Sequence, residues 1–372
     1  MLIVLALKAL LLATIPLTLV YLSRGTDRYR KLAWTMVFFT FDLIVFGAFT
    51  RLTDSGLGCP DWPGCYGEAN PFLAHADISA AEAALPSGPV TVFKAWIEMI
   101  HRYLAMGVGV LIIATLAVSI RLWRREGLPR YHPALPALLL VWVCVQGAFG
   151  AWTVTLKLQP VIVTTHLLLG VGLLALLTWH ATRQSPVQLG ASAAALRLPA
   201  AFALGVAFLQ IALGGWVSTN YAALACGGFP LCQGAWLPDL DFAHGFSLWR
   251  ELGRTHTGDY LPFSALVTAH WVHRSFALVV VAVVGWVGWR ASQSAGMQRI
   301  GRALLLLILI QFCTGIATVL LNWPLTLAVL HNAGAALSVL LLTVVNSRLA
   351  SGAANTAAEF RPTLTSACDR PS

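Results

Sequence analysis

Apolar residues in this chain gather in runs that are long enough to cross a membrane as helices. A spanning helix needs about 20 predominantly apolar residues. Nine runs of this length lie at residues 2–22, 32–51, 94–120, 134–154, 161–181, 198–217, 264–289, 301–321 and 325–347. The first run contains Lys8 and is followed by no clear cleavage site, so we expect it to be retained as a helix. The pattern predicts an all-α polytopic membrane protein.

Composition and charge agree with this class. Hydrophobic residues make up 58% of the 372 residues and charged residues only 10%, whereas soluble domains carry about 25% charged residues. The net charge of +9 comes from arginines and lysines in short runs between apolar segments. That pattern is typical of membrane orientation, and it argues against nucleic acid as a partner.

The basic residues also predict the orientation of the chain. They occupy alternate connections, around residues 24–31, 121–130, 183–197, 290–302 and 348. Basic connections face the cytoplasm. The remaining connections are two short turns, around 156–160 and 322–324, and two long loops, roughly 52–92 and 218–262. We therefore expect the long loops to face outward.

Two pairs of cysteines lie in the long loops. Cys59 and Cys65 are in the first loop, Cys226 and Cys232 are in the second, and five residues separate the members of each pair. Disulfides persist in oxidising compartments, so outward-facing loops favour one bridge in each. Free thiols and a metal site are the alternatives. Zinc is disfavoured because neither loop combines a compact C-x2-C with a histidine at ligand spacing.

The chain contains an internal repeat. Residues 47–67 and 214–234 align without gaps, with matching glycines at both ends and matching cysteines between them. A later set also matches, namely Gln146, Gly150, Thr153 and Val154 with Gln311, Gly315, Thr318 and Val319. Each copy holds four helices and so returns the chain to its starting side. We expect two tandem four-helix transmembrane bundles, related by a pseudo-two-fold axis along the membrane normal, plus one extra N-terminal helix.

This organisation predicts four segments. The extra N-terminal transmembrane helix and its cytoplasmic link span residues 1–31, the first half 32–185, the second half 186–349, and a disordered cytoplasmic tail 350–372.

Four histidines within the predicted helices repeat in register. His101 matches His273, and His166 matches His331. All four lie near the outer ends of their helices, at similar depth. Axial ligation of a haem requires two histidines at one height on separate helices of a bundle, and the absence of C-x-x-C-H argues against covalent attachment. A lone membrane histidine is more often an interhelical hydrogen-bonding group, but recurrence at matched positions favours the ligand role.

Arginines lie beside these histidines. Arg102 and Arg274 each follow a candidate ligand, and their guanidinium groups suit either haem propionates or a structural ion pair. Weaker propionate candidates near the outer boundary are Arg51, Arg250 and Arg254.

One acidic residue distinguishes the halves. Glu98 precedes His101 by three residues, so the two side chains share a helical face. A carboxylate there would act as a general base or stabilise developing positive charge; the alternative is a partner that orients the histidine. The second half has His270 at this position, with no role that the sequence assigns. The difference favours a substrate haem in the first half and an electron-transfer haem in the second.

These residues together resemble one family. The stretch Arg-Leu-Thr-Asp-Ser-Gly-Leu-Gly-Cys-Pro-Asp-Trp-Pro-Gly-Cys at 51–65 and the histidines, arginines, Glu98 and cysteine pairs named above are similar to the haem A synthase family over about residues 32–350. The resemblance implies an enzyme of a bacterial cytoplasmic (inner) membrane, with the long loops on the periplasmic side. It implies oxidation of the C8 methyl group of haem O to the formyl group of haem A for cytochrome oxidase assembly.

The resemblance also implies roles for individual residues. His101 and His166 would hold the substrate haem, Glu98 would be the catalytic carboxylate, and His273 and His331 would ligate a haem b cofactor. Haem O synthase would deliver the substrate, the cytochrome oxidase assembly machinery would take the product, and a quinone is one candidate electron acceptor.

Two other functions remain open from the sequence. A di-haem b-type electron carrier would bind two permanent haems and would not need Glu98. A haem transporter or assembly chaperone would bind one exchangeable haem without redox turnover.

Overall fold

The computed structural model describes residues 1–25, 27–185, 187, 189 and 191–359. Within these residues, nine helices are long and apolar enough to cross a membrane. They are α1 (Leu2–Leu22), α2 (Arg28–Leu52), α4 (Val92–Glu126), α5 (Ala134–Thr155), α6 (Pro160–Arg183), α7 (Arg197–Thr219), α9 (Phe263–Ser292), α10 (Gln298–Leu320) and α11 (Leu325–Glu359). The prediction of an all-α multi-pass membrane protein is confirmed.

Local sequence signals fix where these helices begin and end. The side chain of Asp27 accepts a hydrogen bond from the Arg30 N–H (3.0 Å), and Thr91 caps α4 in the same way through the Lys94 N–H (3.2 Å). Such caps satisfy backbone donors that have no partner inside the helix. At its other end, α4 stops at Gly127, whose φ of +66° is a left-handed conformation that glycine adopts without strain.

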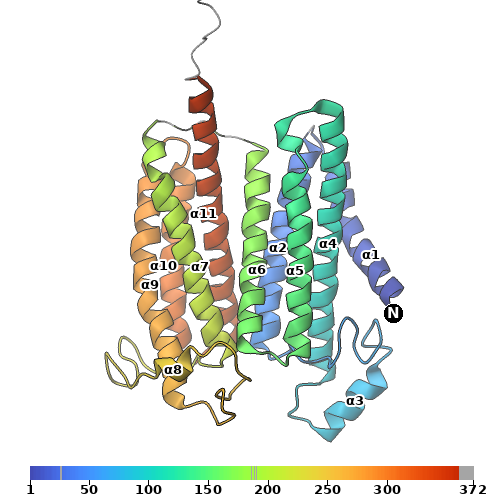
Figure 1. Ribbon diagram of the computed structural model, residues 1–372, viewed down its shortest axis with the longest axis vertical. Helices are drawn as coiled ribbons and strands as arrows, with labels where there is room; N and C mark the ends of the chain where they lie inside the picture. Colours follow the sequence, from blue (N-terminus) through green and yellow to red (C-terminus); the bar gives the residue numbers. More distant parts are fainter. Residues whose placement is uncertain (26, 186, 188, 190, 360–372) are drawn as a thin grey trace, which may run out of the picture.

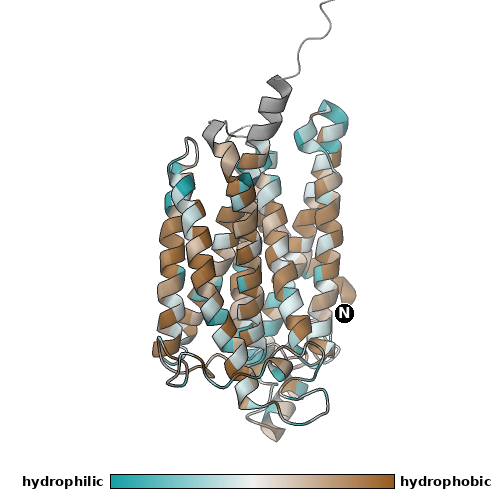
Figure 2. Cartoon of the chain, turned by 60° about the vertical axis from the view of Figure 1, so that its left-hand side comes forward, coloured by the Kyte–Doolittle hydropathy of each residue, from teal (hydrophilic) through white to brown (hydrophobic). Residues whose placement is uncertain are grey.

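The spanning helices lie side by side, and both long loops lie at one end of the molecule (Figure 1). The short helices α3 (His75–Ala84) and α8 (Phe242–Gly245) belong to these loops. The two 3₁₀ turns, η1 (Pro129–Tyr131) and η2 (Ala191–Leu196), belong to connections at the opposite end. Hydrophobic residues dominate the middle of the helices, and hydrophilic residues gather toward their ends and in the loops (Figure 2). A band of this kind suits the hydrocarbon core of a bilayer.

Helix contacts divide the molecule into two groups. In the first group, α4 and α6 each pack against both α2 and α5, so α4 and α6 lie diagonally across from each other. In the second, α9 and α11 each pack against α10 and α7, so α9 and α11 are also diagonal. The groups meet where α6 contacts α7 and α11 and where α2 contacts α11, while α1 packs outside the first group against α4 and α2.

The C-terminal helix is longer than the hydropathy pattern predicts. α11 continues to Glu359, although the sequence predicts a disordered tail from residue 350. Four of the nine residues 351–359 are alanines, and alanine has the highest helix propensity, which accounts for the extension. The predicted tail at 360–372 lies outside the described residues.

Candidate functional site

The four repeated histidines lie on diagonal helices of each group. His101 is on α4 and His166 on α6, while His273 is on α9 and His331 on α11. All four lie toward the loop end of their helices; His166 and His331 come six residues after Pro160 and Leu325, or about 9 Å along the axis. The helices of each pair share their neighbours, since α4 and α6 both pack against α2 and α5, and α9 and α11 both pack against α7 and α10. The structure thus brings the predicted partners together.

Each imidazole packs against a glycine of a neighbouring helix. A Cβ atom built on Gly47 would lie 2.9 Å from Cε1 of His101, and one on Gly214 would lie 2.8 Å from Cε1 of His273. The same contact recurs in the other two cases. These are Gly150 with His166 (3.1 Å) and Gly315 with His331 (3.3 Å). A larger residue would push each ring out of position, so the four glycines fix where the imidazoles sit.

The hydrogen bonding of the imidazoles suits metal ligands. Within the described residues, the side chains of His101 and His273 make no hydrogen bond, and Nδ1 of His101, His166 and His273 is buried without a partner. A buried polar atom without a partner is costly and needs an explanation. Neutral imidazole is a common metal ligand, and two such groups on diagonal helices of one bundle would suit a haem iron, which histidines ligate.

Glutamines brace the helices that carry three of these histidines. Nε2 of Gln146 donates to the backbone carbonyl of His166 (3.0 Å), and Gln311 does the same to His331 (3.1 Å). Gln210 donates to the carbonyl of His273 (3.1 Å). These contacts hold the helix turn that presents each ring. Leu43 occupies the position that matches Gln210 in the first half, so His101 lacks this brace.

Glu98 joins α4 to the first long loop. It is only 4% exposed. One carboxylate oxygen accepts a hydrogen bond from the Cys59 N–H (2.8 Å), and the other pairs with Arg102. Arg102 in turn donates to the carbonyls of Asp61 (2.9 Å) and Gly64. Glu98 therefore lies one helical turn before the predicted ligand His101, and its hydrogen bonds also hold the first long loop against α4.

The second half keeps the contacts between the arginine and the loop carbonyls, but it has a histidine in place of Glu98. Arg274 donates to the carbonyls of Leu231 (3.2 Å) and Cys226 (3.4 Å); Leu231 is the repeat partner of Gly64, which Arg102 contacts. His270 replaces Glu98, and its Nδ1 lies 3.1 Å from the carbonyl of Ala222. Both halves thus anchor their long loop to the helix that carries the first histidine of the pair.

Disulfides close the anchored segments. Cys59 bonds to Cys65 and Cys226 to Cys232, with Cα atoms 4.9 Å and 4.8 Å apart. The predicted bridge in each long loop is confirmed. Each bridge fixes the carbonyl groups that Arg102 or Arg274 contacts.

Three further arginines were weaker propionate candidates, and all have protein partners. Arg51 donates to the carbonyl of Ser218 (2.6 Å) and so links the two halves. Arg254 donates to the carbonyl of Gly258 (3.2 Å). Arg250 is 4% exposed and donates to the side chain of Asn220; burial lowers the pKa of its guanidinium below the usual value. A propionate role for any of the named arginines stays a prediction.

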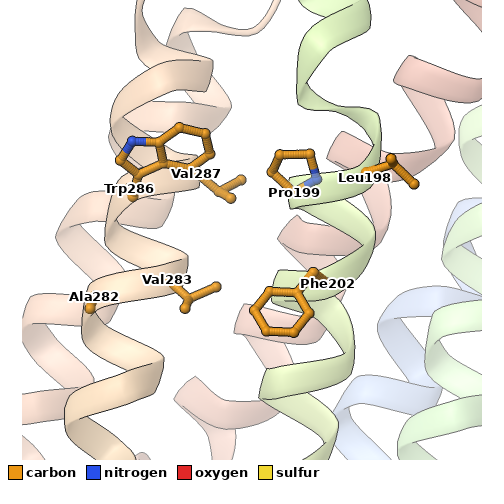
Figure 3. Close-up of a pocket in the computed structure, with 7 residues that line it drawn as sticks. All are labelled: Leu198, Pro199, Phe202, Ala282, Val283, Trp286 and Val287. Atoms are coloured by element: carbon orange, nitrogen blue, oxygen red, sulfur yellow. The ribbon is translucent and has the colours of Figure 1, made fainter.

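An apolar groove of the second half lies away from the histidines. It has a volume of about 580 Å³ between α7 and α9 and is lined by Leu198, Pro199, Phe202, Ala282, Val283, Trp286 and Val287 (Figure 3). These residues lie near the start of α7 and the end of α9, whereas His273 lies near the start of α9. The groove offers no titratable side chain, so the candidate site is the histidine pairs.

The fold defines a multi-pass helical membrane protein with two pairs of histidines between its helices. A family model described as "Cytochrome oxidase assembly protein" (COX15-CtaA) matches residues 30–345. A protein of Shewanella oneidensis named "Heme A synthase" is 37% identical over 322 residues, which cover 85% of this chain and 96% of that protein. A "Heme A synthase" of Bradyrhizobium sp. strain ORS 278 is 30% identical over 329 residues, covering 82% of this chain and 86% of that protein.

The chain belongs to this haem A synthase family of cytochrome oxidase assembly proteins. Membership confirms the family predicted from the sequence and, with it, an oxidoreductase of haem A biosynthesis. All of α1 lies before the matched residues 30–345, as expected for a helix outside the repeat.

Several residues of the site were not singled out from the sequence. The glycines that contact the imidazoles and the glutamines that brace them belong to this group, as does Thr314, which contacts His331. One signal pointed to some of them, since Gly47, Gly150 and Gln146 lie at matched positions of the repeat. Their pairing with particular histidines depends on which helices are neighbours, and this the sequence pattern does not specify.

Proposed function

We propose that this chain is a haem A synthase that oxidises the C8 methyl group of haem O to the formyl group of haem A for cytochrome oxidase assembly. The observation that carries the proposal is the pair of half-buried histidines on diagonal helices of each half, with each ring packed against a glycine. Family membership supports the same activity.

In this proposal the two histidine pairs have different tasks. His101 and His166 hold the substrate haem O, and His273 and His331 hold haem b as a resident cofactor. When bound, haem b supplies a redox centre that passes electrons from the substrate toward an acceptor, for which a quinone is one candidate. The tandem arrangement of two four-helix bundles about a pseudo-two-fold axis would place both pairs at one depth, and the recurring glycine contacts support this.

Glu98 is the carboxylate proposed for the chemistry. It lies three residues before His101 on α4, on the same helical face. Oxidation of a methyl group on a conjugated ring builds positive charge at that carbon, and a buried carboxylate stabilises such charge or accepts a proton from attacking water. Cys59 and Arg102 engage its two oxygens and hold the carboxylate in one orientation.

The surroundings of the site follow from the same proposal. Disulfides in both long loops suit an oxidising compartment, which supports placing these loops on the periplasmic side of a bacterial inner membrane. Haem O synthase would supply the substrate from within the membrane, and the oxidase assembly machinery would receive haem A.

Pigment analysis tests the proposed function. The chain is expressed in a host that makes haem O but no haem A, and the haems of the purified protein and its membranes are extracted and separated. Haem A is expected only when both the chain and haem O are present. Haem B alone, bound at two sites, would indicate the di-haem electron carrier; one exchangeable haem without haem A would indicate the transporter.

A further inference from the structure

His331 differs from the other three histidines in the partner of its ring. Its Nδ1 lies 3.0 Å from Oγ1 of Thr314 on α10. Within the described residues, Nδ1 of His101, His166 and His273 is buried without any partner. One imidazole of the second half is therefore held by a side chain that has no equivalent contact in the first half.

The hydroxyl of Thr314 determines which nitrogen of His331 carries hydrogen. Oγ1 also lies 3.1 Å from the carbonyl oxygen of Gln311. A carbonyl only accepts, and a hydroxyl has a single proton to donate, so that proton goes to Gln311. The oxygen then accepts from His331, and Nδ1 carries the hydrogen. The neutral ring is left with the lone pair on Nε2, the form that ligates a metal.

The first half lacks this group at the matched position. Residues 146–150 read Gln-Gly-Ala-Phe-Gly, and residues 311–315 read Gln-Phe-Cys-Thr-Gly, so Phe149 stands where Thr314 does. Phe149 packs against Trp152, with ring centroids 5.0 Å apart, and its side chain cannot accept a hydrogen bond. Nδ1 of His166 is therefore without the partner that fixes His331, and within the described residues the ring has as its only polar contact Nε2 of Gln146, a distant 3.5 Å from its Nε2.

We propose that Thr314 makes the second half a permanent haem site by locking His331 in its ligating form, and that Phe149 leaves the first half able to release its haem. This inference rests on the proposed function, in which one haem stays as a cofactor and the other leaves as product. Partners that orient a metal-ligating histidine raise its basicity, and their loss costs about 10–100-fold in affinity. Thr314 is a positioning residue, because it acts through His331.

Haem dissociation from the purified full chain tests the proposal. Thr314→Val has nearly the same shape but removes the acceptor, and transfer of haem b to apomyoglobin is expected to become about 10–100-fold faster. Thr314→Ser keeps the hydroxyl and should restore the wild-type rate and spectrum. Thr318→Val is the matched control, since Thr318 is on the same helix and donates to the carbonyl of Gly315 (2.7 Å) without touching a histidine.

The reverse exchange provides a second variant should Thr314→Val fail to fold. Phe149→Thr places the hydroxyl in the first half, where slower release of the first-half haem is expected. The proposal is overturned if Thr314→Val or Phe149→Thr leaves haem release unchanged, or if Thr318→Val accelerates it equally. Because haem release is measured without turnover, this outcome is separate from haem A formation: a chain that makes no haem A contradicts the proposed function, whatever these rates are.

Discussion

Replacing Glu98 by glutamine separates the two roles that the structure gives this residue. The carboxylate receives two donors, the Cys59 N–H at 2.8 Å and the guanidinium of Arg102. Glutamine has the same shape but only one carbonyl oxygen, so its NH₂ group must face one of these donors. The substitution therefore abolishes the ion pair in either orientation, loses the hydrogen bond to Arg102 or to the Cys59 N–H, and removes the charge that the chemistry would use.

The structural effect has an expected size. Removing one partner of a buried ion pair costs about 3–5 kcal/mol. Arg102 keeps the carbonyls of Asp61 and Gly64 as acceptors, so we expect the lower end, about 3 kcal/mol, as local loosening of the loop around Cys59. Loss of a general base lowers activity by about 10²–10⁴-fold. An activity loss in this range that is larger than the loss in a variant with the same loosening of the loop would indicate the chemical role.

The assay combines haem A yield with protection of the loop from proteolysis. Arg102→Gln is the control, because it breaks the same ion pair and leaves the carboxylate in place. If Glu98 acts in the chemistry, Glu98→Gln abolishes haem A formation while Arg102→Gln loosens the loop and keeps measurable activity. Full activity of Glu98→Gln, or equal losses in both variants in proportion to loop loosening, would refute the chemical role.

Three other predictions follow from contacts of the same kind. Gly214→Ala places a Cβ atom 2.8 Å from Cε1 of His273 and should lower haem b content several-fold. Gly205→Ala is the control, because it is on the same helix and its Cβ atom would have nothing within 4 Å. A pyridine haemochrome assay measures the haem b content of both variants. Lys8→Met removes hydrogen bonds to the Ala69 carbonyl and the Tyr103 hydroxyl, each 3.1 Å long; it should weaken docking of α1 by about 1.5–3 kcal/mol, seen as faster proteolysis of the α1–α2 link. Both disulfides should resist alkylation in untreated membranes, and rapid labelling would contradict the bridges.

The helices were predictable because hydropathy alone decides which segments span a membrane. The ends of the helices were less predictable. The residues after 350 carry no long apolar run, yet their alanines continue α11 to Glu359. The histidines were found because each half repeats them at the same depth. No such signal exists for the partners of Arg102, which are backbone carbonyls in a loop that a disulfide closes. Side-chain types do not reveal backbone acceptors, so the sequence left propionates and an ion pair as alternatives.

The proposed difference in function between the halves rests on the matched positions at which they differ. The framework is the same in both: a glycine packs against each imidazole, a disulfide closes each long loop, and one arginine ties that loop to its helix. Besides Leu43 opposite Gln210, the exceptions near the histidines are Glu98 opposite His270 and Phe149 opposite Thr314. Two copies that bound permanent haems for electron transfer alone would need neither difference. A half that must transform and then release its haem needs both differences. It requires a carboxylate for the chemistry and a histidine ligand that can dissociate from the haem. We therefore infer that the acid and the missing hydroxyl in the first half serve one task, which is turnover of a haem as substrate.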